Sequence, residues 1–264
     1  MTLTTIDHLR RLYTQYERIQ ATSPDVHREE LPNLIRLIPV ETGDRGAVLY
    51  SRLDAADADA AIRAQIAYFE QLGYDFEWKH YDYDTPPDLK ARLAAHGFEL
   101  EESETIMALP LAQTPAALLQ PVTHDVRRIH DPDELAAIRR IKAEVWGEER
   151  DFVTHFLRLT LTQTPERISV YVAYADKTPV SCGWIFFPTE SPFASLWGGS
   201  TLTRHRKQGF YTALLAVRVQ EAIARGKQHL TIDASLMSRP IVERFGFIRL
   251  AESTPCIWRV RKNE

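Results

Sequence analysis

The chain is predicted to have an α+β fold made of two similar halves. Runs rich in β-branched and aromatic residues alternate with amphipathic helical stretches, which indicates mixed sheets flanked by helices. Residues 72–100 and 225–250 repeat one order of turn, strand, short helix, Gly-Phe and strand. Between them, residues 112–124 contain two prolines and no hydrophobic period, which is typical of a linker. Domains are therefore expected at 1–111 and 125–264, and 264 residues suffice for two domains of ordinary size.

In the first half, a helix is expected near the N-terminus, where Leu9, Tyr13 and Tyr16 share one face at helical spacing. The runs 34–40 and 46–53 are β-rich and joined by Glu-Thr-Gly-Asp-Arg, which predicts a hairpin. The remaining elements are expected in the order helix 54–72, strand 75–83, short helix 87–96 and strand 100–111.

The second half should open with a helix that begins at Asp131. Asp131 suits the N-cap, Pro132 the first helical position, and Glu134 completes a capping box. The buried positions of this helix and the next are expected at Leu135, Ile138, Ile141 and Val145, and at Phe152, Phe156 and Leu159. The expected order then continues with hairpin 168–187, strand 193–202, a second long helix, strand 229–235, short helix 238–247 and strand 254–261.

Composition excludes several classes of function. The net charge of -4 and the pI of about 6.2 argue against a general affinity for nucleic acid. No apolar run approaches ~20 residues, and the N-terminus is charged throughout, so we expect a cytoplasmic protein without a membrane span or secretory signal. Cys182, Cys256 and the nine histidines lack metal-ligand spacing, so no metal is expected.

The segment 196–226 contains the most informative pattern in the chain. A strand ends at Leu202, a short loop follows that contains Arg206, Lys207 and Gly209, and an amphipathic helix begins directly afterwards. The first N–H groups of a helix have no partner within the helix, and the positive end of its dipole lies there. The pattern therefore predicts a site for a pyrophosphate, which a glycine would allow to approach the backbone closely.

The run Arg206-Lys207-Gln208-Gly209-Phe210-Tyr211 resembles the (Q/R)-x-x-G-x-(G/A) signature of the GNAT superfamily of N-acetyltransferases. The downstream SRPIVERFGF resembles the short helix and Gly-Phe turn of the same family, and about 140 residues follow the order of its elements. The resemblance implies tandem GNAT-like domains, each with a mixed, mostly antiparallel sheet flanked by helices. The first would be a degenerate copy.

The resemblance also implies roles for individual residues. Acetyl-CoA, or another acyl-CoA, would be the co-substrate, and an amine would attack it directly in a ternary complex. The strand 229–235 should diverge from 193–202 and let the co-substrate reach the acceptor. Backbone groups of Gly199, Ser200, Thr201 and Leu202 would bind the pantetheine arm, and those of Arg206, Lys207, Gln208, Gly209, Phe210, Tyr211 and Thr212 the pyrophosphate.

The chain departs from the family pattern at two positions. The last signature residue is Tyr211, whose ring must either cover the phosphates or turn away from them. Many members carry a tyrosine acid four residues before the Gly-Phe turn, where this chain has Val242. Tyr211 and Ser235 are the substitutes we expect for that acid, and Glu144 is our candidate general base, with Glu148, Glu149, His155 and Glu190 as further candidates.

The first half lacks the signature. Asp54, Asp57 and Asp59 stand where the basic loop would be, and carboxylates repel phosphates. Three hypotheses follow: an N-acyltransferase acting on a small-molecule or peptide amine, a non-catalytic acyl-CoA sensor or scaffold, and a pure interaction protein. Arg206, Lys207 and Gly209 argue against the third, and Val242 keeps the second open. The first half would shape the acceptor side or form an interface, which leaves a homodimer open.

Overall fold

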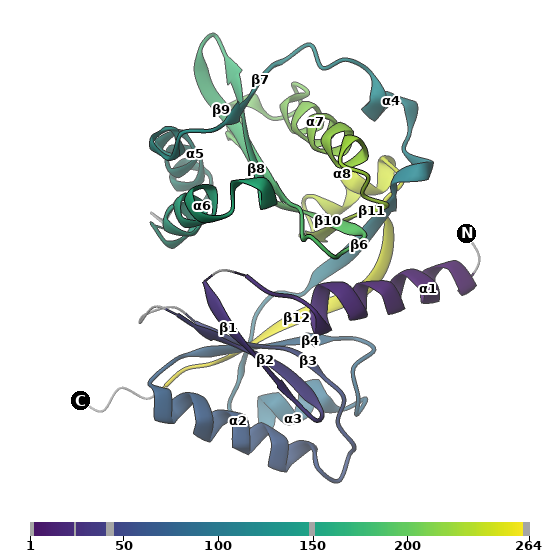
Figure 1. Cartoon of the computed structure of the whole chain (residues 1–264), viewed down its shortest axis with the longest axis vertical. Helices are drawn as coiled ribbons and strands as arrows, with labels where there is room; N and C mark the ends of the chain where they lie inside the picture. Colours follow the sequence, from purple (N-terminus) through teal and green to yellow (C-terminus); the bar gives the residue numbers. More distant parts are fainter. Residues whose placement is uncertain (1–2, 24, 41–44, 148–150, 261–264) are drawn as a thin grey trace. The chain divides into compact units, whose positions relative to one another are not determined.

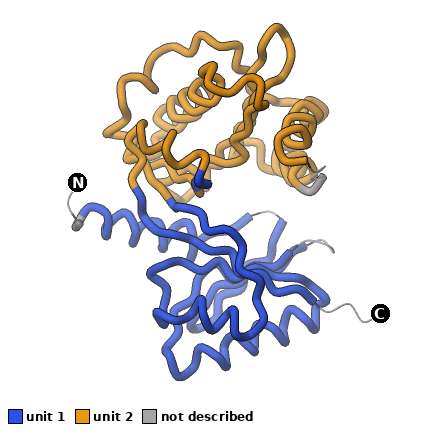
Figure 2. The backbone as a smooth tube through the Cα atoms, turned by 180° about the vertical axis from the view of Figure 1, so that it is seen from behind, with its two compact units in different colours: residues 1–106, 234–236, 249–264 blue, residues 107–233, 237–248 orange. Residues whose placement is uncertain are grey.

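The computed structural model describes residues 3–23, 25–40, 45–147 and 151–260. The chain folds into two compact units (Figure 2). Unit 1 comprises residues 1–106, 234–236 and 249–264, and unit 2 comprises residues 107–233 and 237–248. Within the described residues, no helix is long and apolar enough to cross a membrane.

The two units do not follow the order of the chain. Strand β6 (Glu104–Pro110) passes from unit 1 into unit 2, and strand β12 (Ile248–Trp258) passes from unit 2 into unit 1. Each half therefore gives most of its last strand to the other unit. Hydrophobic patterning marks a strand but not the sheet that it joins, so the sequence could not indicate this exchange. The segment 112–124 lies in unit 2 and contains a short helix, α4 (Ala116–Leu119), whose Leu118 is buried.

The sheet of unit 1 has the order β1-β2-β3-β4-β12, with β5 beside β12. Strands β3 and β4 are parallel, and the other pairs are antiparallel. The hairpin predicted from residues 34–53 is confirmed as β2 and β3, whereas β1 was missed because its sequence, VHREEL, is mostly polar. The bounds are α1 Leu3–Tyr13, a π-helix Thr14–Ile19, β1 Val26–Leu31, β2 Leu34–Pro39, β3 Gly46–Ser51, α2 Ala58–Leu72, β4 Phe76–Tyr81, α3 Leu89–Ala95 and β5 Glu99–Leu100.

An aromatic cluster fills the core of unit 1 between its sheet and α2. Phe69 of α2 stacks on Phe76 of β4 with ring centroids 4.3 Å apart. Gly46 admits this ring, because a Cβ there would lie 2.2 Å from Cε1 of Phe69. Figure 1 shows α2 and α3 on one face of this sheet.

The sheet of unit 2 has the order β6-β11-β10-β9-β8-β7. Strands β10 and β11 are parallel. Strands β7, β8, β9 and β10 each pair with the next one along the chain, and these pairs are antiparallel. Figure 1 shows α5 and α6 on one face and α7 on the other. The bounds are β7 Asp125–Ile129, a 3-10 turn Pro132–Leu135, α5 Ala136–Trp146, α6 Asp151–Gln163, β8 Ile168–Ala175, β9 Thr178–Phe186, β10 Phe193–Thr201, a 3-10 turn Thr203–His205, α7 Phe210–Ala224, β11 His229–Ala234 and α8 Arg239–Arg244.

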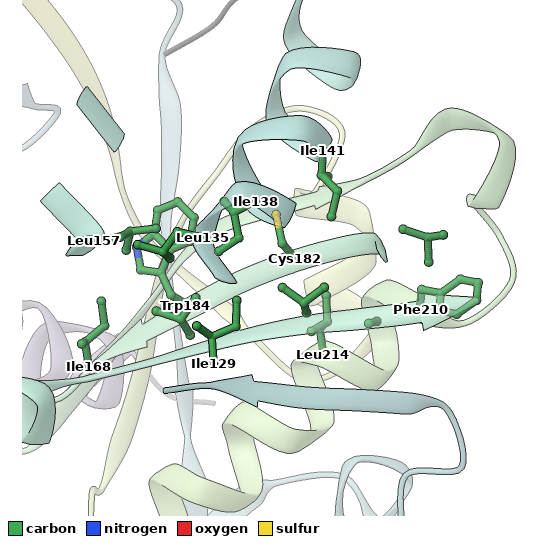
Figure 3. Close-up of a cluster of buried hydrophobic side chains, with 14 of the residues drawn as sticks. Ile129, Leu135, Ile138, Ile141, Leu157, Ile168, Cys182, Trp184, Phe210 and Leu214 are labelled. Carbon is green, nitrogen blue, oxygen red and sulfur yellow. The ribbon is translucent and has the colours of Figure 1, made fainter. Parts of the chain in front are cut away.

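The core of unit 2 confirms the stripe predicted for α5 and shifts that of α6. Figure 3 shows Leu135, Ile138 and Ile141 pointing into the apolar cluster, and Val145 packs against its edge. In α6 the buried hydrophobic residues are Leu157 and Leu161, whereas Phe156 and Leu159 are only partly buried. The side chain of Phe152 lies outside the described residues. Asp131 accepts a hydrogen bond from the Asp133 N–H, so its N-cap role is confirmed.

Candidate functional site

The parallel strands β10 and β11 form the base of the candidate site. Their register pairs residues 193–196 with 229–232 and ends at Leu196 and Ile232. Both strands continue beyond that point, β10 to Thr201 and β11 to Ala234. The divergence predicted for these two strands is therefore confirmed, and it begins in the middle of β10.

A bulge in β10 follows at once. Trp197 pairs with Trp184, and Ser200 pairs with Cys182. Two residues of β10, Gly198 and Gly199, therefore lie opposite one residue of β9, Gly183. Gly198 has a φ of 65°, and a Cβ there would lie 1.9 Å from Cζ3 of Trp184. The bulge therefore depends on glycine both for its backbone conformation and for the close approach of the Trp184 ring.

Beyond the bulge, β10 keeps its bonds to β9 on one edge. Ser181 Oγ donates to the Ser200 carbonyl at 2.8 Å, and the Leu202 N–H donates to the Val180 carbonyl at 3.0 Å. Backbone groups alternate in direction along a regular strand, so those of Thr201 point to the opposite edge, where β11 has diverged and where the Thr201 carbonyl accepts from Arg206.

The loop after β10 leads directly into α7. Gly209 is the N-cap with a φ of 88°, and its carbonyl accepts the first helical bond, from Ala213, at 2.9 Å. For the N–H groups of residues 210–212 no acceptor is found in the part of the chain that the structure describes. Such groups at a helix N-terminus are suited to bind an anion.

Three exposed basic side chains belong to this loop. Arg204 forms an ion pair with Glu144 of α5. Arg206 donates from Nε to the Thr201 carbonyl at 3.3 Å, and Lys207 adopts a φ of 61°. Within residues 3–23, 25–40, 45–147 and 151–260, no carboxylate forms an ion pair with Arg206 or Lys207. Two positive charges are thus left beside the open end of α7.

A histidine that the sequence did not single out lies against this loop. The Nε2–H of His124 donates to the Gln208 carbonyl at 2.9 Å, and its ring packs edge-on against Phe210. A Cβ on Gly209 would lie 2.9 Å from Cε1 of His124. The space beside Gly209 is therefore filled by an imidazole, so its positive φ and this ring both require a glycine, while the contact of its backbone with a phosphate stays a prediction.

The structure also decides how Tyr211 is oriented. A Cβ on Gly199 would lie 3.1 Å from Cε2 of Tyr211, so the ring packs on the bulge and not over the N-terminus of α7. Burial raises the pKa of Tyr211, and the positive charge of Arg218 opposes that rise. Tyr211 therefore presents a protonated phenol to the inner side of the bulge.

The other predicted acid and base residues differ in their surroundings. Val242 is fully buried in α8, so that helix offers no acid at this position. Ser235 falls in the segment 234–236, which belongs to unit 1. The Glu144 carboxylate is held by Arg204, and its role as a base stays a prediction. Glu190 and His155 are exposed, while Glu148 and Glu149 lie outside the described residues.

Two exposed tryptophans lie in β10 or beside it. Trp146, at the end of α5, donates from Nε1 to Ser200 Oγ at 3.2 Å and is 46% exposed. Trp197, in β10, is 41% exposed, so it does not belong to the core although Trp184 does. Across the described ranges, no three His, Cys, Asp or Glu side chains gather as a metal ion would require.

No protein-family model and no curated protein matches the chain, but solved structures do. A GCN5-related N-acetyltransferase from Kribbella flavida superposes with a TM-score of 0.70 at 16% identity, over 94% of each chain. A tandem GNAT protein from the clavulanic acid biosynthesis pathway gives 0.62 at 13% identity, over 99% of this chain and 96% of that one. A GCN5-related N-acetyltransferase from Sphaerobacter thermophilus gives 0.62 at 14% identity, over 88% of this chain and 78% of the other. The chain therefore has the tandem GNAT fold over nearly its whole length.

Proposed function

We propose that unit 2 binds acyl-CoA and transfers its acyl group to an amine. The observation that carries this proposal is the divergence of β10 from β11, which is followed directly by the open N-terminus of α7. An extended pantetheine arm would find the free edge of β10, and a pyrophosphate would find N–H groups beside Arg206 and Lys207. Acetyl-CoA is the simplest co-substrate of this class.

The contacts to the co-substrate divide between strand and helix. The backbone of Gly199 and the N–H of Thr201 would bind the pantetheine amides, while Ser200 and Leu202 stay bonded to β9. The backbone of residues 206–212 would surround the phosphates. A small-molecule or peptide amine, after losing a proton to a base such as Glu144, would then attack the thioester directly.

A non-catalytic acyl-CoA sensor or scaffold is the second candidate. The observation that favours it is the buried Val242, which removes the tyrosine acid from α8. The two candidates share a binding site and differ only in turnover. A thiolate of pKa ~8.5 is a tolerable leaving group, so loss of one acid lowers the rate without abolishing it.

Incubation with acetyl-CoA and a panel of amines should release free CoA, which a thiol reagent detects. The panel would include amino acids, a polyamine, an arylalkylamine and peptides with a free N-terminus. The expected result is thiol release above the hydrolytic background with at least one amine, together with the acetylated product by mass spectrometry. Tight binding of CoA without release across the panel would favour the sensor.

We propose further that unit 1 binds no CoA. Asp59, near the start of α2, is held by Arg92 and by His96, which donates from Nε2 at 2.9 Å. Hydrogen bonding from His96 lowers the pKa of Asp59, with the charge of Arg92 acting in the same direction, so a negative charge stays where a phosphate would bind. We therefore expect one CoA per chain.

Reversing the two free charges of the loop should remove CoA binding. In Arg206→Glu with Lys207→Glu, two charge-assisted contacts become repulsive, so the affinity should fall at least about 100-fold. Lys177→Glu is a matched control, because Lys177 is an exposed lysine of unit 2 with a φ of 66°, close to the 61° of Lys207. Calorimetry should show one site for wild type and for the control. Equal affinity in all three proteins, or two sites per chain, would contradict the proposal.

A further inference from the structure

Two arginines are almost completely buried within the described part of the chain, and they differ in their partners. Arg18 of unit 1 is 1% exposed and forms a bidentate ion pair with Asp84. Arg218 of unit 2 is 2% exposed and donates only to carbonyls, from Nε to Leu214 at 2.9 Å and from Nη1 to Trp184 at 3.2 Å. No described carboxylate forms an ion pair with Arg218.

The nearest acid along α7 has other partners. Glu221 accepts hydrogen bonds from Ser169 at 2.7 Å and Tyr171 at 2.9 Å, and it forms an ion pair with Arg225 at 2.7 Å. Arg128 approaches the same carboxylate at 3.3 Å. Glu221 is thus neutralised by two other arginines and does not balance the charge of Arg218.

The remaining ionisable groups around Arg218 are uncharged. They are Tyr211 of α7, Cys182 of β9 and Tyr171 of β8. Burial raises the pKa of Cys182 to about 12 and raises the pKa of both tyrosines. Burial also lowers the pKa of Arg218, although arginine remains protonated in proteins. Unit 2 therefore holds a cation on the inner side of α7 without an anion to match it.

The fold makes room for this cation in the middle of β9. A Cβ on Gly183 would lie 2.9 Å from Nη1 and 3.1 Å from Cζ of Arg218. An unpaired buried charge destabilises a fold, so an apolar side chain at position 218 would be the stabler choice. Features that oppose stability in this way are expected where function requires them.

Arg218 is directed toward the bulge through Tyr211. The two residues are seven positions apart on α7 and so share one face. The Nε bond to the Leu214 carbonyl turns the Arg218 side chain back toward the N-terminus of the helix. Tyr211 lies in that direction with its ring on Gly199 of the bulge. The guanidinium, the phenol and the bulge thus follow one another on the inner side of the sheet.

Resting on the proposed acyl transfer, we propose that Arg218 is a positioning residue that stabilises, through Tyr211, the negative charge of the departing thiolate. The pair takes the place of the tyrosine acid that α8 lacks at Val242. The tyrosinate that forms when Tyr211 protonates the thiolate is then the missing partner of the buried guanidinium.

The step balances as follows. The amine nitrogen forms a bond to the thioester carbon, and the carbon–sulfur bond breaks with its electron pair on sulfur. The Tyr211 O–H bond breaks and an S–H bond forms, which leaves a tyrosinate beside Arg218. The amine loses a proton to the base. The base passes this proton through solvent to the tyrosinate, which restores the phenol. The products are the amide and CoA thiol.

The test compares Arg218→Met and Arg218→Lys with Tyr211→Phe and the double variant Tyr211→Phe with Arg218→Met. Arg218→Met should lower kcat at least tenfold, because it weakens Tyr211 as the general acid, and complete loss of a general acid typically slows a reaction by about 10²–10⁴. The dissociation constant of acetyl-CoA should change less than about twofold, and Arg218→Lys should recover part of the rate. In the Tyr211→Phe background, loss of Arg218 should have no further effect.

Two measurements separate this role from a structural one without turnover. The ratio of the affinity for CoA to the affinity for S-methyl-CoA should rise with pH in wild type, because only CoA forms a thiolate. This rise should be smaller in Arg218→Met. The Tm of Arg218→Met should equal that of wild type or exceed it by about 2–4 °C, because an unpaired charge is removed. A lower Tm with weaker acetyl-CoA binding, or independent effects of the two substitutions, would overturn the inference. Absence of CoA binding by wild type would instead refute the proposed function.

Discussion

Replacing Gly198 with alanine should disable the site and destabilise unit 2. An alanine must adopt the φ of 65° found there, a left-handed conformation that disfavours an L-residue by about 1–2 kcal/mol. Its methyl group would also lie 1.9 Å from Cζ3 and 2.0 Å from Cη2 of Trp184, a core side chain. Forcing such a ring to move destabilises a core by about 1–3 kcal/mol. We expect the free energy of unfolding to fall by about 3 kcal/mol and turnover to fall by about 100-fold, because the bulge is displaced.

Gly226 provides a matched control within the same unit. It has a φ of 71°, and a Cβ there would meet nothing within 4 Å. Gly226→Ala therefore carries the backbone strain without the clash and should lose about 1 kcal/mol while CoA binding is unchanged. Urea unfolding followed by tryptophan fluorescence measures the loss of stability, and calorimetry measures CoA binding. If Gly198→Ala and Gly226→Ala lost CoA binding to a similar extent, the loss would not be specific to position 198, and the bulge would not depend on Gly198.

Local patterns in the sequence predicted the elements well, because they depend on neighbours along the chain. The hairpin of β2 and β3, the stripe of α5 and the divergence of β10 from β11 all follow from periodicity or from the family order. The exchange of β6 and β12 does not, because a strand's hydrophobic pattern fits either sheet equally. Strand β1 was missed because a polar edge strand lacks that pattern.

The site shows the same limit at the level of single residues. The basic loop and Gly209 could be found from the signature, since charge and residue spacing are local, whereas the bulge at Gly198 was not predicted. The packing of His124 on Gly209 could not, because 84 positions separate His124 from its partner Gln208. Arg218 was not predicted to be buried or functional. Its burial depends on the gap that Gly183 leaves in β9, and no local spacing reports such a gap.

Replacing Arg18 with methionine should destabilise unit 1 more than any change at its surface. Arg18 donates to both oxygens of Asp84 at 2.8 and 2.9 Å, to the Leu49 carbonyl at 3.0 Å, and its guanidinium lies 3.8 Å from the centre of the Tyr81 ring. Burial disfavours its charged form, but Asp84, Tyr83 and Tyr81 together outweigh this, and the pKa of Arg18 is raised. Methionine would leave the buried Asp84 carboxylate without its cation. Breaking a buried pair in this way typically removes about 3–5 kcal/mol.

Urea unfolding followed by circular dichroism would measure this loss, and a second substitution would assign it to the pair. Asp84→Asn in the Arg18→Met background removes the unmatched charge while its amide oxygen can still accept from the Tyr81 N–H, which now bonds Asp84 at 3.0 Å. We expect the double variant to recover at least about half of the loss, because an unpaired charge is worse than a neutral polar group in the same place. The comparison with Arg218→Met is the sharper one, since both arginines are buried and only Arg18 has a carboxylate partner. Opposite changes in stability would show that burial of an arginine is supported in unit 1 by its counterion and tolerated in unit 2 without one. A loss within about 1 kcal/mol for Arg18→Met would mean that the ion pair contributes no more than an exposed one.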